Sequence, residues 1–173
     1  MIPAAVITAW SQAHPWSSPA QVEQDLALSR ALVEIYCDPV LADALVFRGG
    51  TALHKLFLSP AARYSEDLDF VQREGSPIGP VLDHLQERLN PWLGEPRRKV
   101  STRGSTLVYR FLSEVPPVVN LRLKIEINTR EHFQIHPLRT IPFGHVGFAF
   151  RVKAQDSPIM RRPKHCAYLI ITI

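Results

Sequence analysis

The most constraining feature of the sequence is a segment of strict alternation, Leu-Arg-Leu-Lys-Ile-Glu-Ile-Asn, at residues 121–128. Leucine or isoleucine occupies every second position, and charged or amide side chains occupy the positions between them. A period of two places alternate side chains on opposite faces of a β-strand. The segment therefore predicts a half-buried strand whose polar face carries Arg122, Lys124, Glu126 and Asn128.

Helical and strand patterns elsewhere predict the remaining elements. Ser18 precedes Pro19, and Gln21 follows Ser18 by three positions, which is the signature of a helix start. This helix is expected to run to about Cys37. We also expect a short N-terminal helix, a turn or helical turn at 39–44, and a strand that begins at 45–47 and ends at 48–50. A helix at 51–58, a strand at 65–71, a helix at 81–89 stopped by Pro91, and strands at 106–112 and 145–153 are expected to follow. Helices mixed with strands in this order predict an α+β (mixed α/β) fold.

Size and composition limit the class of protein. The 173 residues suit one ordinary domain, and 46% hydrophobic with 21% charged residues argues against disorder. No run approaches the roughly 18 apolar residues that cross a membrane. The N-terminus lacks the basic segment of a signal peptide, and Cys37 and Cys166 form neither a disulfide framework nor a zinc pattern. We expect a cytoplasmic enzyme.

Charge is distributed unevenly along the chain. Residues 1–96 hold 6 Lys and Arg against 12 Asp and Glu, whereas residues 97–173 hold 14 against 4. A basic second half favours a polyanion partner, because neutralising phosphates releases counterions. The best local patch is Arg97-Arg98-Lys99 with Arg103, although aromatic residues for base stacking are few there. A solvated basic face is the alternative.

Two glycines stand between the strand expected at 45–47 and the helix expected from Thr51. Glycines at this junction allow the backbone to approach a ligand closely. Unpaired N–H groups at a helix start favour a phosphate. Gly49, Gly50 and Thr51 are therefore candidates for nucleotide phosphate binding, although many tight turns contain a glycine pair.

A pair of aspartates, Asp67 and Asp69, follows on the strand expected at 65–71. Their spacing places both carboxylates on one face, about 6.6 Å apart in rise, with Leu68 and Phe70 facing the core. Neighbouring carboxylates repel unless a cation lies between them. Mg²⁺ or Mn²⁺ prefers such oxygen ligands. We expect a metal site and catalytic role here; a solvated outer face of an edge strand is the alternative.

Glu126 becomes a third carboxylate if the strand at 121–128 lies beside the Asp67–Asp69 strand. It would then ligate a metal or act as general base on the attacking hydroxyl. Lys124, two residues earlier on the same face, is expected in the nucleotide site. The alternative is a solvated Lys124–Glu126 ladder.

Polar residues flanking these positions complete the candidate site. Arg63 is expected to hold a triphosphate oxygen, with an ion pair to Glu66 or Asp67 as the alternative. Ser65 is placed beside it in the nucleotide site. Lys55 lies one turn into the helix after Thr51, where an exposed lysine is expected; an approach to the phosphates is the alternative.

The order Gly-Gly-Thr-Ala-Leu, then Arg-x-Ser-x-Asp-Leu-Asp-Phe, resembles the AbiEii-type nucleotidyltransferase toxins of the polymerase-β-like superfamily. The resemblance runs from about residue 21 to about residue 153. It implies a nucleotidyltransferase-like mixed sheet flanked by helices, as a catalytic domain of residues 1–153. It also implies that the glycine turn holds the triphosphate and that the paired aspartates bind metal, with Glu126 where a third acid is often found.

The resemblance further implies transfer of a nucleotide from a nucleoside triphosphate to an RNA acceptor, with transfer RNA as a candidate, by a toxin paired with an antitoxin in abortive infection. Family members usually continue into a helical half, whereas residues 154–173 are expected to form an atypical tail with an exposed β-prone end at 168–173. An inactive remnant that binds nucleotide or antitoxin, and a basic RNA-binding module, are the alternative functions.

Overall fold

Four of the five helices in the described part of the chain begin or end where simple sequence signals occur. The structure, a computed structural model, describes residues 2–14, 16–58, 64–132, 138–143 and 167–171. The Ser18 hydroxyl accepts a hydrogen bond from Gln21 N–H at 3.3 Å, which confirms the predicted cap. Asp38 ends the second helix and caps the third through Val40 and Leu41 N–H. The helices are α1 (Ala4–Ala13), α2 (Pro19–Cys37), α3 (Pro39–Ala44), α4 (Gly49–Phe57) and α5 (Gly79–Leu93).

The prediction that Pro91 stops its helix is wrong. Helix α5 continues through Pro91 to Leu93, and it ends at Gly94, which has a φ of 79°. Pro91 removes one backbone donor near the C-terminal end of α5, and the helix extends only two residues beyond it. Gly94 adopts the left-handed conformation that most residues avoid, and its N–H reaches the carbonyl of Asn90.

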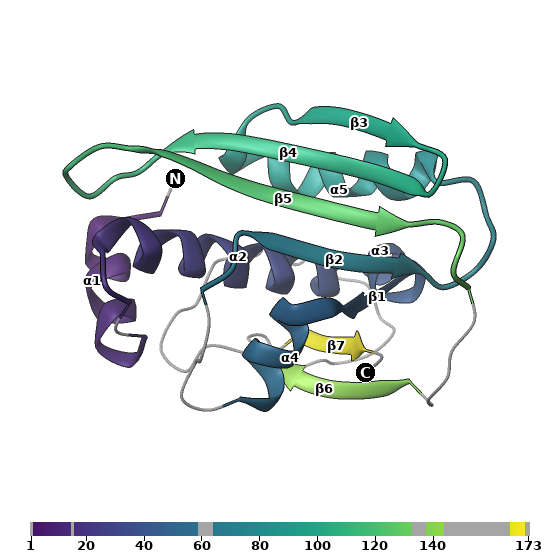
Figure 1. Cartoon of the computed structure of the whole chain (residues 1–173), viewed down its shortest axis with the longest axis horizontal. Coiled ribbons are helices and arrows are strands. Elements are labelled where there is room, and N and C mark those ends of the chain that lie inside the picture. The colour runs from purple at the N-terminus through teal and green to yellow at the C-terminus, as the bar shows by residue number, and fades with distance from the viewer. Residues whose placement is uncertain (1, 15, 59–63, 133–137, 144–166, 172–173) are drawn as a thin grey trace, which may run out of the picture.

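The strands of the described residues form one mixed sheet in the order β3-β4-β5-β2-β1-β7-β6 (Figure 1). Strands β2 and β5 are parallel, as are β1 and β7, and the other neighbours are antiparallel. The strands are β1 (Leu45–Arg48), β2 (Asp67–Gln72), β3 (Arg97–Ser101), β4 (Gly104–Leu112), β5 (Asn120–Asn128), β6 (Arg139–Phe143) and β7 (Ala167–Ile171).

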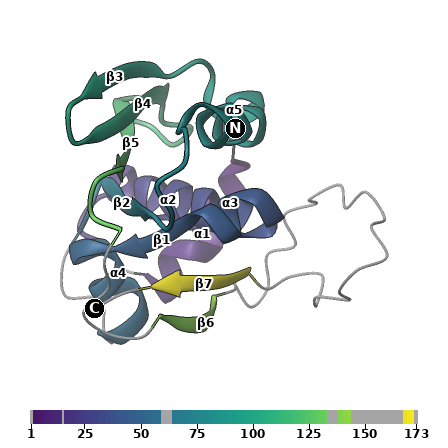
Figure 2. The ribbon, with the colours of Figure 1, turned by 90° about the vertical axis from the view of Figure 1, so that its right-hand side faces the viewer.

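Helices α2, α3 and α5 cover one face of the sheet, and α4 lies on the other side near β1 (Figure 2). The main core lies between helices α2, α3 and α5 and the inner side chains of the strands. Each fully buried aliphatic or aromatic side chain there contributes about 1.5–3 kcal/mol. The opposite face of β3, β4, β5 and β2 carries no helix in front of it (Figure 1). We call it the open face.

The predicted α+β fold with a mixed sheet is confirmed, and three regions of it need comment. Strand β3, at residues 97–101, was not predicted as a strand. The C-terminal segment is β-structured as expected, but β7 pairs on both sides, with β1 and β6, and is not an exposed tail. The strand expected at 145–153 lies outside the described residues, and the boundary at residue 153 stays a prediction.

Candidate functional site

The turn between β1 and α4 requires glycine at residue 49. Gly49 has a φ of 82°, which is unfavourable for any residue with a Cβ atom. A Cβ at this position would also lie 2.6 Å from Asp69 Oδ2. The start of α4 is therefore in direct contact with the carboxylate of Asp69. Gly49 and Gly50 are both exposed, so a ligand can reach the first turn of the helix.

The first turn of α4 has no side-chain cap. Arg48 occupies the cap position without a side-chain hydrogen bond to the turn, and its guanidinium instead contacts Glu131 at 2.7 Å. The first four N–H groups of a helix lack intrahelical partners. The partial positive charge of this end therefore lies beside Asp69 and is open to an anion.

Thr51 and Ser65 join α4 to the beginning of β2. Thr51 Oγ1 donates to the carbonyl of Asp67 at 2.7 Å and lies 2.5 Å from Ser65 Oγ. Asp67 N–H donates to Ser65 Oγ at 3.4 Å. Only 3% of Thr51 is exposed. The arrangement holds the backbone of Asp67 at a fixed distance from the helix start, and both hydroxyls are used for that purpose.

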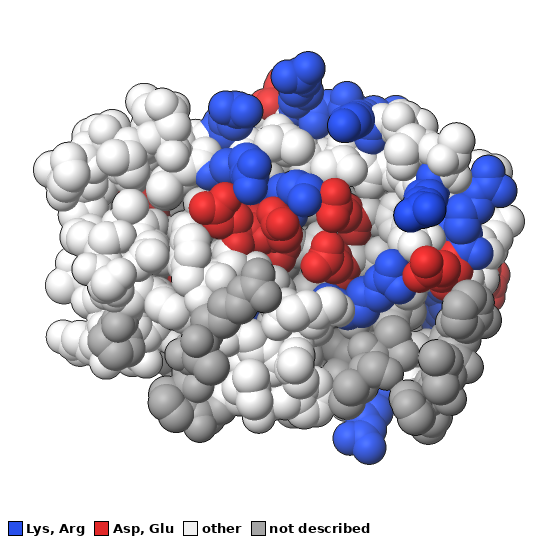
Figure 3. All heavy atoms as spheres, viewed as in Figure 1, with Lys and Arg blue, Asp and Glu red and all other residues white. Residues whose placement is uncertain are grey.

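Parallel pairing of β2 with β5 brings the predicted acids together. Asp69 is opposite Glu126, and Asp67 is opposite Lys124. Side chains of directly paired residues lie on the same face of a sheet. Asp67, Asp69 and Glu126 therefore share the open face beside α4, and Leu68 and Ile125 face the core. Figure 3 shows acidic side chains gathered at the middle of this face.

Lys124 lies among these carboxylates. Its Nζ is 3.3 Å from Asp67 Oδ2 and 3.1 Å from Glu126 Oε1. Although burial lowers it, the pKa of Lys124 is raised by hydrogen bonds to Glu126 and Asp67 and by their negative charges. Arg122 is bonded to Glu66 at 2.9 Å and lies 3.9 Å from Asp67 Oδ1. Lys124 is thus the nearest counter-ion of the acids.

The cluster still carries more negative than positive charge. Burial raises the pKa of the Asp69 carboxyl above its ordinary value, and the charges of Glu126 and Asp67 raise it further against Lys124 and Arg48. Asp67 Oδ1 is buried and has no hydrogen-bond partner, since Arg122 is too distant for a hydrogen bond. Among the described residues, no group of three His, Cys, Asp or Glu side chains forms a ready-made metal site.

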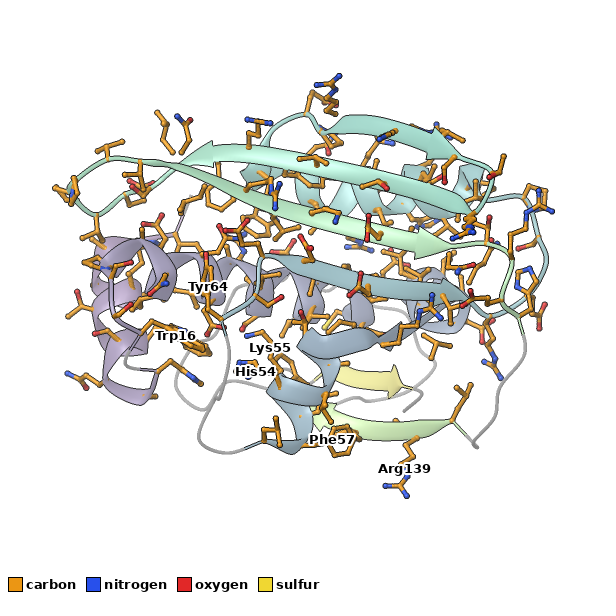
Figure 4. The ribbon with its side chains drawn as sticks, viewed as in Figure 1. Trp16, His54, Lys55, Phe57, Tyr64 and Arg139 are labelled. Atoms are coloured by element: carbon orange, nitrogen blue, oxygen red, sulfur yellow. The ribbon has the colours of Figure 1, made fainter. Side chains whose placement is uncertain are left out.

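The structure modifies two expectations about neighbouring residues. Arg63 lies outside the described residues, so its expected contact with phosphate stays a prediction. Lys55 is buried instead of exposed: its Nζ is 2.7 Å from Asp25 Oδ1 and 2.8 Å from Ser29 Oγ. In Figure 4 Lys55 points from α4 toward α2, away from the open face. It is therefore not placed to contact a phosphate at the start of α4.

Sequence reasoning missed the partner of Lys55. Asp25 is buried in α2, and its other oxygen accepts a hydrogen bond from Trp10 Nε1 at 3.0 Å. The only signal in the sequence is a charged residue on the apolar side of a helix. That signal identifies a buried charge without identifying its partner 30 residues away.

The fold is similar to that of solved structures from two bacteria. A Helicobacter pylori protein described as a nucleotidyltransferase is 23% identical, with a TM-score of 0.52 over 72% of this chain and 52% of its own. JHP933, also from Helicobacter pylori, is 23% identical, with a TM-score of 0.53 over 72% and 50%. MenT4, a nucleotidyltransferase toxin from Mycobacterium tuberculosis H37Rv, is 23% identical, with a TM-score of 0.49 over 75% and 44%. The chain spans about half the length of these proteins.

Residues 30–158 match the family described as nucleotidyl transferase AbiEii toxin, type IV toxin–antitoxin system. The chain belongs to this family, which confirms the resemblance carried by the glycine turn and the paired aspartates. No curated protein matches the sequence. None of the helices in the described ranges is long and apolar enough to cross a membrane.

Proposed function

We propose that this chain provides the catalytic site of a nucleotidyltransferase that moves a nucleotide from a nucleoside triphosphate to a hydroxyl of an RNA acceptor. The observation that supports this most directly is the register of β2 against β5. It gathers Asp67, Asp69 and Glu126 on an open face, in contact with the uncapped start of α4. A helix start can bind phosphate oxygens, and carboxylates beside it can hold a metal ion that assists transfer of a phosphoryl group.

The residues of the cluster fit a divalent cation, Mg²⁺ or Mn²⁺. Hard cations take carboxylate oxygens as ligands, and Asp67 Oδ1 is a buried oxygen without a hydrogen-bond partner. The raised pKa of Asp69 reflects burial and unneutralised neighbouring charge, which a cation would relieve. Asp67, Asp69 and Glu126 would hold the metal once their side chains turn toward one another, since they do not form a three-ligand site as they stand. When bound, it would neutralise charge on the transferring phosphoryl group.

The residues around the carboxylates have separate tasks in this proposal. The exposed backbone of Gly49 and Gly50 receives phosphate oxygens at the positive end of α4. Thr51 and Ser65 are positioning residues, because their hydroxyls bond to Asp67 and to each other. Lys124 is near enough to the acids to exchange its contacts for a phosphate oxygen when a cation enters.

Membership of a toxin family supports a toxic activity restrained by an antitoxin. We propose that transfer RNA is the acceptor, that the reaction takes place in the cytoplasm, and that the cellular outcome is growth arrest of the kind seen in abortive infection. The family match supports this part of the proposal without identifying the acceptor.

The test is incubation of the protein with total RNA, Mg²⁺ and each labelled nucleoside triphosphate in turn. Transfer of label to RNA by the wild type, and none by Asp69→Asn, is expected. Asp83→Asn is the matched control, because Asp83 is exposed on α5, away from the cluster. If the wild type binds a nucleoside triphosphate with Mg²⁺ but labels no RNA, the chain binds nucleotide without transferring it to RNA and the proposal is wrong.

A further inference from the structure

Three cations on the open face lie outside the acidic cluster. Arg97 and Lys99 belong to β3, in which all residues are exposed, and Arg110 is exposed on β4. In the described part of the chain, none of the three is in an ion pair, whereas Arg122 and Lys124 both contact acids. We call Arg97, Lys99 and Arg110 the open-face cations.

The sheet register aligns these cations with the carboxylates. Arg97 is opposite Val108, and Lys99 is opposite Thr106. Two rows of paired residues therefore cross the open face from β3 to β2: Lys99, Thr106, Glu126 and Asp69 in one, and Arg97, Val108, Lys124 and Asp67 in the other.

Arg110 is opposite Arg122 in the next row on the same face. Adjacent strands are about 4.8 Å apart, so β3 lies roughly 14 Å from the acids on β2. Figure 3 shows the same arrangement: basic side chains extend over β3, β4 and β5, next to the acidic group.

We propose that the open-face cations bind the sugar–phosphate backbone of a single-stranded nucleic-acid end, whose terminal hydroxyl reaches Asp67, Asp69 and Glu126. This inference rests on the proposed function for the identity of the reacting hydroxyl. The side chains between the cations and the acids on β4, Thr106 and Val108, are small and half-buried. A ligand backbone can therefore lie flat across β4 and continue toward β2.

The chemistry of the surface predicts how it binds. Arginine and lysine contacts to phosphates position a strand without reading its bases. Among the residues that the structure describes, no exposed aromatic ring lies beside these cations, since Tyr109 is buried on the inner side of β4. Binding is therefore independent of sequence and strongly dependent on salt. Each phosphate contact on a single strand contributes about 0.7 to the slope of log affinity against log salt.

The strand β3 supplies its own control. Arg98 is exposed like its neighbours but pairs with Leu107, whose side chain faces the core, so it lies on the opposite side of β3. Arg73 is exposed beyond the end of β2 and pairs with Asp43. The variant Arg97→Gln/Lys99→Gln and the control Arg98→Gln/Arg73→Gln thus remove equal charge, and only the first removes open-face cations.

The experiment measures fluorescence anisotropy of labelled 12-nucleotide RNA and DNA strands of two unrelated sequences, in EDTA and without nucleotide, between 50 and 300 mM salt. We expect the Arg97/Lys99 variant to bind about 20-fold more weakly at 0.1 M salt, with the slope reduced by about 1.4. The Arg98/Arg73 control should match the wild type. Melting temperatures of both variants should stay within about 2 °C of the wild type, since exposed substitutions change stability little.

Equal weakening in variant and control would overturn the inference, because net charge alone would explain the binding. Failure of the wild type to bind any strand would also overturn it, and would leave an acidic protein as the occupant of this face. Label transfer is scored separately. If the Arg97/Lys99 variant transfers label and binds the strands as tightly as the wild type, the proposed binding surface is wrong but the proposed function stands. If strand binding depends on Arg97 and Lys99 but the wild type transfers no label, the proposed function is wrong but the binding surface stands.

Discussion

Two groups of charged side chains in this molecule are built differently. In the interior, between α2 and α4, Asp25 and Lys55 form one closed pair, with side-chain exposures of 6% and 7% and further hydrogen bonds from Trp10 and to Ser29. On the open face, Asp67, Asp69 and Glu126 have Lys124 as their nearest cation. The buried pair balances its charges, whereas the open cluster does not.

The pKa shifts record this difference. Burial alone would raise the pKa of Asp25, but the charge and hydrogen bond of Lys55 hold it below its ordinary value. The pKa of Asp69 is raised by burial and by the acids beside it. Ionised Asp25 therefore favours the folded state, and ionised Asp69 opposes it. The proposed cation would relieve the repulsion that the open cluster carries in the chain alone.

The largest expected effect tests the open cluster. Asp69→Asn should abolish Mg²⁺-dependent nucleotide binding, with label transfer reduced at least about 10³-fold, because metal ligation contributes several kcal/mol to the transition state. The thermal midpoint should stay equal or rise, since the substitution removes repulsion. Mn²⁺ binding followed by electron paramagnetic resonance, together with calorimetry, measures both. Unchanged Mn²⁺ affinity would show that Asp69 is not a ligand.

The second prediction tests the closed pair. Lys55→Met leaves Asp25 buried without a counter-charge, and breaking a buried pair in this way costs about 3–5 kcal/mol. For a chain of this size the midpoint should fall by about 10 °C. The double variant Asp25→Asn/Lys55→Met should recover much of the loss, because no uncompensated charge remains. If Lys55→Met instead lowered Mn²⁺ affinity at constant stability, Lys55 would belong to the site and not to the core.

Local sequence patterns predicted the strands and the helix that hold the site residues. Alternation predicted β2, β4 and β5, and the glycine pair predicted the start of α4, because each signal lies within a few consecutive residues. Chemistry also follows from such patterns: two aspartates separated by one residue on a strand must share a face. The placement of Glu126 depended on β2 and β5 being neighbours, which the sequence left as a condition.

Long-range partners could not be predicted in the same way. Asp25 and Lys55 are 30 positions apart, and nothing in either local pattern specifies the other. Strand β3 has no alternating apolar face, since all five of its residues are exposed, so its strand character comes only from pairing with β4. Thr51 was predicted to contact phosphate from its position, but its hydroxyl is buried against β2, a contact that only the fold creates.

The third prediction concerns the contact between helix and acid. Gly49→Ala imposes a strained φ, which costs about 1–2 kcal/mol, and its Cβ would displace the Asp69 carboxylate. We expect both a lower midpoint and weaker Mn²⁺ binding. Gly79→Ala is the control, because Gly79 starts α5 with open space around it and should tolerate alanine. Loss of stability with full Mn²⁺ affinity would mean that Asp69 does not depend on this turn.

The smallest effect asks whether a buried carboxylate contributes stability when its cationic partners are exposed, as Arg88 and His84 are beside Asp38. Asp38 caps α3 and lies 2.9 Å from Arg88 Nε and 3.3 Å from His84 Nδ1. Burial acts to raise the pKa of Asp38, but hydrogen bonds from Arg88, Leu41 and His84 bring it below its ordinary value. Asn is as good a helix cap as Asp, so Asp38→Asn removes the charge while keeping the cap.

Asp38→Asn should therefore lower the free energy of unfolding by about 1 kcal/mol at pH 7. A folded-state pKa below the unfolded value of about 3.9 means that this stabilisation is complete above pH 4 and is lost as the pH falls through the folded pKa. Urea denaturation of both proteins at pH 7, 4.5 and 2.5 should thus give the same difference at the first two values and a smaller one at the third. A difference that already vanishes at pH 4.5 would show that the folded pKa of Asp38 is raised, and that Asp38 resembles Asp69 more than Asp25.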